Sequence, residues 1–222
     1  MSHLTTSEGI AGNDAGIARV LRDGTGEPGG TRGRILMSGT GGIVETSAAA
    51  RTDAGMLALW NPARFAHITS YPAWECALLD EHDIARHVQA GDLVPVNIGA
   101  DGAFGFTVRT GPPGAVALTG REHQHLMASS QRYLYRSAGV ACLSGIEDIS
   151  ADPGPAVTTL AVPAGRCAVT IHLIDWAAEP GATDQHGRAT PSALPDFVIL
   201  ICPPTDDKHY RAELQTFDRP DG

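Results

Sequence analysis

The sequence has little of the chemistry that several protein classes require. Its 222 residues include 16 Lys and Arg against 25 Asp and Glu, giving a formal charge of −9 and a pI near 5.4. Because binding to phosphates needs clustered basic residues, nucleic acid is not an expected partner. Lys208 is the only lysine and lies in a polar tail, which argues against Schiff-base or phosphate-loop chemistry.

Long apolar runs and paired cysteines are also missing. No stretch of about 18 apolar residues is present, so no transmembrane helix is expected, and the first ten residues do not resemble a secretory signal. The four cysteines, Cys76, Cys142, Cys167 and Cys202, are far apart in sequence and have no zinc-ribbon spacing. We therefore expect four reduced thiols in a cytoplasmic protein.

The chain divides by composition into a leader, one domain and a tail. Residues 1–33 are rich in small and polar residues and are expected to form a flexible leader. Residues 34–217 are expected to form a single compact α+β domain, and residues 218–222 a frayed tail. The Thr-Gly-Pro-Pro-Gly segment at 110–114 is the strongest internal break, so a bilobed arrangement is an alternative.

The first half of the domain contains one clear helix signal among strand signals. Asp80 at an N-cap and Gly91 at a C-terminal turn bound a short helix. We predict strands at 74–79, 93–98 and 104–108, with Asp101-Gly102 closing a hairpin between the last two. Two further strands joined by a glycine turn are predicted within 34–46, followed by a loop over 47–55.

The second half is richer in strands. Alternating apolar residues predict a strand over 167–173, and the apolar run at 197–202 predicts a central strand covered on both faces. An edge strand is expected within 209–217. Together these patterns predict an α+β fold dominated by mixed or antiparallel sheet, with few short helices.

A metal site is one alternative suggested by histidine spacing. On a strand, His123 and His125 would share a face beside Glu122, with His172 or Asp175 as a third ligand. A polar surface loop containing two histidines explains the same residues without a metal.

No other catalytic motif is assembled in the sequence. Ser38, Ser144 and Cys142 are candidate nucleophiles, but none lies in a nucleophile elbow or a recognisable protease context. The glycine-rich run at 38–42 lacks the residues of a phosphate-binding loop and is better interpreted as a hairpin turn. We therefore predict no catalytic residue and no cofactor, and the balance is against an enzyme.

Recognition of another protein is the remaining explanation. Asp175 and Trp176 follow the strand at 167–173, and a tryptophan at a strand end often anchors an interface. Glu147 and Asp148 add acidic character to a second loop. Since a negative surface speeds capture of a basic partner, we expect a cytoplasmic, non-enzymatic binding protein of the immunity or regulatory type. A metal-dependent enzyme using His123 and His125 and a self-assembling structural subunit are the alternatives.

Overall fold

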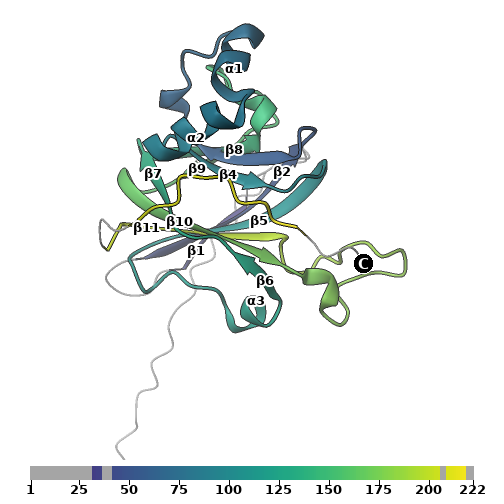
Figure 1. The fold of residues 1–222 in the computed structure, drawn as a ribbon. Coiled ribbons are helices and arrows are strands. Elements are labelled where there is room, and N and C mark those ends of the chain that lie inside the picture. Colours follow the sequence, from purple (N-terminus) through teal and green to yellow (C-terminus); the bar gives the residue numbers. More distant parts are fainter. Residues whose placement is uncertain (1–31, 37–41, 206–208, 219–222) are drawn as a thin grey trace, which may run out of the picture.

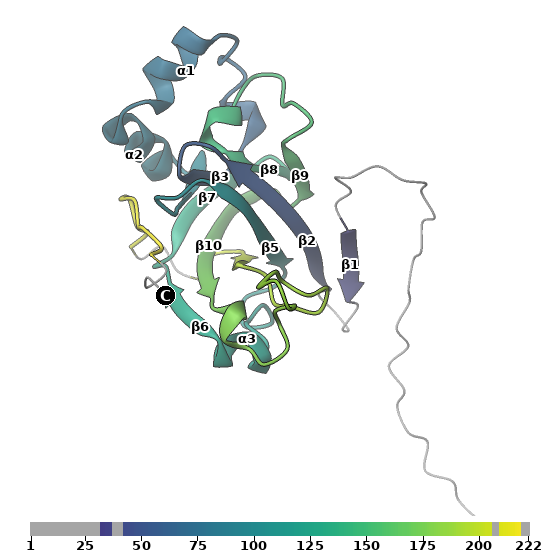
Figure 2. The same ribbon diagram turned by 90° about the vertical axis from the view of Figure 1, so that its right-hand side faces the viewer.

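A computed structural model describes residues 32–36, 42–205 and 209–218, whose strands form two sheets. The seven-stranded sheet A has the order β1-β2-β5-β11-β10-β6, with β7 also paired to β10; the four-stranded sheet B has the order β4-β3-β8-β9. The strands of sheet A are β1 (Arg32–Leu36), β2 (Ile43–Thr52), β5 (Gly102–Thr110), β11 (Phe197–Cys202), β10 (Gly165–Ile174), β6 (Leu126–Ser129) and β7 (Tyr133–Ser137). Those of sheet B are β4 (Leu93–Asn97), β3 (Met56–Trp60), β8 (Val140–Gly145) and β9 (Thr158–Ala161). Figure 2 shows β1 at the edge of sheet A, beyond β2.

The two sheets lie one above the other, with helices beyond them (Figure 1). The helices α1 (Tyr71–Leu78) and α2 (Glu81–Ala90) lie beyond sheet B, and α3 (Gly120–Gln124) lies at the opposite end, below sheet A. Short 3-10 turns are η1 (Pro62–Arg64), η2 (Ile146–Asp148) and η3 (Trp176–Ala178). All five side chains of β3 are buried, so both faces of this strand are covered. Within the described part of the chain, no helix is long and apolar enough to cross a membrane.

The core joins both sheets in one apolar cluster. Phe197 stacks on Phe106 with ring centroids 5.3 Å apart and meets the edge of Phe217 at 5.6 Å. These rings contribute heavily because aromatic side chains bury large areas and gain further from stacked or edge contacts. The predicted α+β class, dominated by mixed and antiparallel sheet, is confirmed: among the described strand pairs only β5–β11 is parallel.

Several local predictions are confirmed. β11 is a central strand between β5 and β10, as its two-sided apolar run indicated. α2 begins after Asp80 and ends at Gly91, whose φ of 78° is in the left-handed region that glycine adopts readily. β1 and β2 pair across the predicted segment 34–46, but β1 begins at Arg32, so the predicted leader is wrong for its last two residues, Arg32 and Gly33. Residues 37–41 of the predicted glycine turn and residues 1–31 of the leader lie outside the described residues.

The strand predicted at 74–79 is wrong, because this segment belongs to α1. Ser70 is the N-cap and accepts a hydrogen bond from the Ala73 amide at 3.4 Å, and Pro72 follows in the first turn. Proline is tolerated there, since the first amides of a helix have no internal partner. Trp74 therefore projects from a helix.

The predicted hairpin between 93–98 and 104–108 is also wrong. β4 pairs with β3 in sheet B, whereas β5 pairs with β2 and β11 in sheet A. The segment at Asp101-Gly102 instead connects β4 of sheet B to β5 of sheet A. The predicted loop at 47–55 is wrong over its first two-thirds, because β2 continues to Thr52 and pairs with β5 up to that residue.

The segment 209–217 does not form the predicted edge strand. It makes isolated bridges at Tyr133–Arg211 and Asn97–Thr216, and it buries Phe217 in the core. Each sheet contains strands from both sides of the predicted break at 110–114. That segment leaves the end of β5 and leads toward α3.

Candidate functional site

Two surface cavities each include one of the predicted binding residues: Trp176 lines the first and Glu147 the second, whereas Asp175 and Asp148 line neither. The first has a volume of about 620 Å³ and lies between the start of β5 and residues 189–196. Trp176 lines it and donates its indole N–H to Asp196 Oδ1 at 2.9 Å, while Asp196 Oδ2 accepts from the Gly105 amide at 2.7 Å. Asp175 caps η3 by accepting from the Ala178 amide. Both carboxylate oxygens of Asp196 are thus already bonded to other groups that line this cavity.

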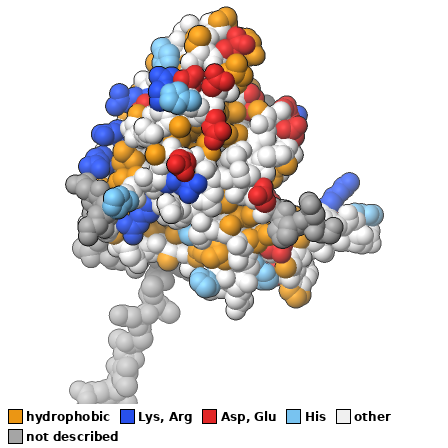
Figure 3. Space-filling model, in the orientation of Figure 1, with side chains coloured by type: hydrophobic (Ala, Val, Ile, Leu, Met, Phe, Trp, Pro, Cys, Tyr) orange, Lys and Arg blue, Asp and Glu red, His pale blue; other side chains and the backbone are white. Residues whose placement is uncertain are grey.

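The second cavity, which we call the α1 cleft, has a volume of about 480 Å³. It is lined by residues 68–71, Trp74, Glu147 and residues 149–152. One wall is the start of α1, and the other is η2 with the loop that follows it. Figure 3 shows acidic and hydrophobic side chains gathered over this α1–α2 end of the molecule, while Lys and Arg lie mainly along one edge of the face.

The aromatic wall of the α1 cleft is formed by Tyr71 and Trp74. Their rings lie nearly parallel, with centroids 5.9 Å apart and an interplanar angle of 12°. Trp74 is half-buried and donates its indole N–H to the Ile146 carbonyl at 2.9 Å, which joins α1 to η2. Tyr71 remains 67% exposed, so most of its ring is available to a ligand.

The acidic wall is held in place by the end of β2. Glu147 accepts hydrogen bonds from the Asp53 amide at 2.6 Å and from the Thr52 hydroxyl at 3.1 Å. A Cβ added at Gly145 would lie 2.5 Å from the Glu147 carboxyl carbon, so a larger residue there would move this carboxylate. Each Glu147 oxygen thus has one partner and can accept another hydrogen bond.

Negative charge accumulates around this wall. Asp152 lines the cleft, and Asp148 adjoins Glu147. Burial, followed by the charges of Glu147 and Asp53, raises the pKa of the Asp148 carboxyl. Arg51 offsets part of this charge through its ion pair with Asp53 at 2.7 Å, but both of those side chains are well exposed.

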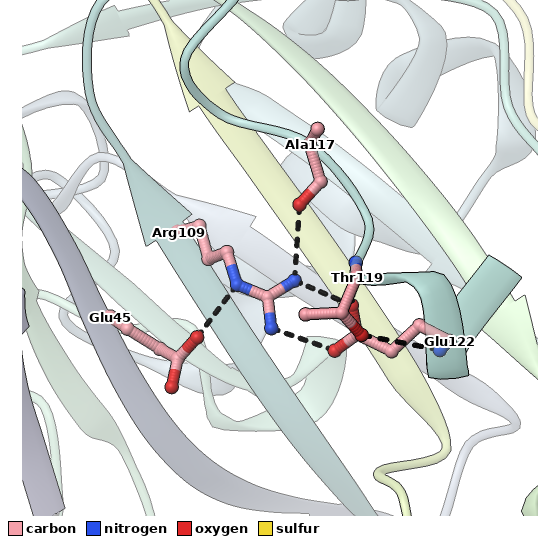
Figure 4. A network of polar contacts seen from close by, with 5 residues as sticks. All are labelled: Glu45, Arg109, Ala117, Thr119 and Glu122. Atoms are coloured by element: carbon pink, nitrogen blue, oxygen red, sulfur yellow. Dashed lines mark hydrogen bonds and ion pairs between the residues drawn. The ribbon is translucent and has the colours of Figure 1, made fainter.

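A separate, closed polar network lies on sheet A, where Figure 4 shows Arg109 between two carboxylates. Arg109 donates to both oxygens of Glu122 at 2.7 Å each and to Glu45 at 2.7 Å. Glu122 also accepts from the Thr119 amide, and Thr119 in turn caps α3. Burial alone would raise the pKa of Glu122, but the bonds from Arg109 and Thr119 outweigh it and lower the pKa.

This network fastens α3 to the sheet and offers little to a ligand. Arg109 is 7% exposed and Glu122 only 3% exposed. Burial tends to lower the pKa of Arg109, yet the bonds to Glu122 and Glu45 raise it, so the ion pair is stable in its charged form. We interpret it as a structural element.

The structure does not assemble the predicted histidine site. His123 lies in α3 and His125 caps its C-terminus, so the two are on a helix rather than on one face of a strand. His172 lies on β10, where its Nδ1 is 2.8 Å from Ser129 Oγ. Burial lowers the pKa of His172, against the opposing effect of Glu122. Among the described residues, no three His, Cys, Asp or Glu side chains are grouped so as to hold a metal ion.

Ser144 and Cys142, two of the candidate nucleophiles, are buried in the core and, within the described part of the chain, have no feature that would activate them. Ser144 is fully buried, accepts from the Trp60 indole at 3.1 Å and donates to the Gly145 carbonyl. Burial raises the pKa of the Cys142 thiol, which disfavours the reactive thiolate. Ser38 and Lys208 lie outside the described residues.

The two aromatic residues of the α1 cleft were not predicted as a site from the sequence. The wrong strand prediction at 74–79 began at Trp74, which separated this residue from Tyr71. The available signal was Ser70 followed by Pro72, a common pattern at the start of a helix. It would have placed Tyr71 and Trp74 three residues apart on one helical surface.

Comparison with known proteins gives no family. No family model matches the chain, and no curated protein matches it. Among solved structures, a chain described as "Crocagin biosynthetic gene J" is similar with a TM-score of 0.46 and 16% sequence identity, over 74% of this chain and 98% of that one. A likeness this distant carries no argument about function.

Proposed function

We propose that this protein is a non-enzymatic binding protein of the cytoplasm, which holds a basic segment of a protein partner in the α1 cleft. An immunity-type or regulatory factor would act in this way. The observation that carries the proposal is the composition of one cleft: a well-exposed tyrosine, Tyr71, lines the same cavity as the acidic residues Glu147 and Asp152. Aromatic and acidic groups together suit cationic side chains.

Two wider features support this function. The formal charge of −9 would attract a basic partner from a distance and speed its association. The four cysteines are free thiols in the structure, which suits the reducing conditions of the cytoplasm. Nothing in the geometry of the described residues favours the metal-enzyme or self-assembly alternatives over binding.

The proposal is tested with a labelled heptapeptide that contains three lysines among glycines and serines, and with its counterpart containing glutamates. Fluorescence anisotropy measures binding at 50 and 200 mM salt. We expect the lysine peptide to bind and the glutamate peptide not to bind. Binding of the lysine peptide should be weaker at 200 mM salt because charges are screened.

Charge variants show whether binding occurs in the α1 cleft. Asp152→Asn combined with Glu147→Gln should weaken binding about tenfold, the loss expected for charge-assisted contacts. The matched control, Glu213→Gln with Asp218→Asn, removes the same charge from exposed positions outside the cleft lining. Equal weakening in both double variants would show non-specific attraction and would contradict the proposal.

A further inference from the structure

The exposed tyrosine of the α1 cleft can distinguish two cationic side chains of equal charge by their shape. We infer that the cleft recognises the guanidinium group of an arginine side chain in the partner, in preference to the ammonium group of a lysine. This inference rests on the proposed function, since it names the side chain that the basic segment must supply.

The first argument is the flat aromatic surface. Tyr71 stacks on Trp74 with one face and is 67% exposed, so its other face is open to a ligand. A planar guanidinium stacks on such a ring by both cation–π and dispersion contact, whereas a lysine ammonium is compact and strongly hydrated. The Tyr71–Trp74 pair is held in position by the Trp74–Ile146 hydrogen bond, so little ordering is needed on binding.

The second argument is the fixed carboxylate. Glu147 is oriented by the Asp53 amide and the Thr52 hydroxyl, with both oxygens still able to accept. Arginine presents several N–H donors in a planar fork and can bond to two carboxylate oxygens at once. Asp152, on the same cleft, supplies a second acceptor.

The positive end of α1 also lies at this cleft and would oppose a cation. Its effect is reduced because Ser70 accepts the Ala73 amide and Pro72 has no amide hydrogen. A helix terminus carries about half an elementary charge, while Glu147 and Asp152 carry about one each. The charge of the two carboxylates therefore exceeds that of the helix end, and the net charge of the cleft is negative.

The experiment compares three heptapeptides in which two lysines flank a central arginine, lysine or citrulline. Citrulline keeps the planar shape of arginine but has no charge. We expect the arginine peptide to bind about fivefold more tightly than the lysine peptide, the factor expected for one stacked cation–π contact. The citrulline peptide should bind at least tenfold more weakly than the arginine peptide.

Two variants locate this preference. Tyr71→Leu should abolish the difference between arginine and lysine while leaving salt-dependent binding, whereas Leu79→Ala, an exposed residue of the same helical region outside the cleft lining, should preserve it. Gly145→Ala should weaken arginine binding about tenfold by displacing Glu147 without changing charge. Its control is Gly120→Ala, where an added Cβ would meet open space.

The outcomes separate the two proposals. Cleft-dependent binding of basic peptides with no arginine preference, or a preference that survives Tyr71→Leu, would overturn the arginine inference and leave the proposed function intact. If no basic peptide binds at all, the proposed function fails and the inference fails with it. An arginine preference lost only in Tyr71→Leu and Gly145→Ala supports both.

Discussion

The buried ion pair between Arg109 and Glu122 allows a quantitative prediction for Glu122→Gln. Both Glu122 oxygens accept from Arg109, so either orientation of a glutamine amide would direct its NH₂ group at an Arg109 donor. Removing one partner of a buried pair costs about 3–5 kcal/mol. Because Arg109 keeps its bond to Glu45, we expect about 3 kcal/mol. For a chain of this size that corresponds to a fall in Tm of about 6–12 °C.

Urea unfolding followed by tryptophan fluorescence measures this change. The matched control is Glu179→Gln, which breaks the ion pair between Glu179, at the end of η3, and Arg121 of the same small helix α3; this pair is more open to solvent, with the Arg121 side chain 47% and the Glu179 side chain 17% exposed. Exposed pairs contribute about 1 kcal/mol or less. If Glu122→Gln destabilises the fold no more than Glu179→Gln does, the network is not a buried structural element.

The same network gives a pH dependence with a defined sign. The pKa of Glu122 is lowered in the folded state. Its contribution to stability is therefore complete above the ordinary glutamate pKa of about 4.3 and is lost as the pH falls through the lowered folded value. We expect the difference in unfolding free energy between wild type and Glu122→Gln to shrink in that acidic range. A constant difference would contradict this linkage.

Three further predictions concern other sites. Burial lowers the pKa of His172. Its contribution to the free energy of unfolding should therefore be complete above about pH 6.5 and be lost as the pH falls through the lowered value. The free energy of unfolding of His172→Asn, measured at pH 7.5 and 5, should change less with pH than that of wild type. Ser144→Ala leaves the buried Trp60 indole N–H without its partner, which should cost about 1–3 kcal/mol in urea unfolding, and an unchanged midpoint would refute this role. Bound arginine peptide should lower the raised pKa of Asp148 by adding positive charge nearby, as followed by NMR titration of its carboxyl carbon; an unchanged pKa would place the peptide elsewhere.

Sequence patterns predicted the elements of the fold better than their partners. The two-sided apolar run at 197–202 predicts a central strand, and the glycine at the end of α2 predicts where that helix stops. Both predictions are correct because each depends on a local requirement of the chain. Pairing depends on contacts between distant segments, so the turn signal at Asp101-Gly102 did not reveal that its flanking strands enter different sheets. At 74–79, a short apolar run suited both strand and helix, and only the upstream cap distinguishes them.

The candidate site was only partly predictable for the same reason. The sequence predicts Glu147 as a binding residue of an acidic loop, but its place in a cleft depends on Tyr71, which lies more than 70 residues earlier and lines the same cavity only in the folded chain. Arg109 lies in a strand whose alternation shows a half-buried face, yet its partner Glu122 becomes evident only when α3 is placed against sheet A. His123 and His125 were close in sequence, but the helix turned them away from a common face.

Binding in the α1 cleft is tested most directly by backbone amide chemical-shift mapping of the intact protein during titration with the arginine heptapeptide. We predict that the perturbed amides cluster at residues 68–74 and 147–152, with the Trp74 indole signal among them. Saturable shifts confined instead to residues 101–107 and 189–196, or no saturable shift at millimolar peptide, would show that the cleft is not the binding surface.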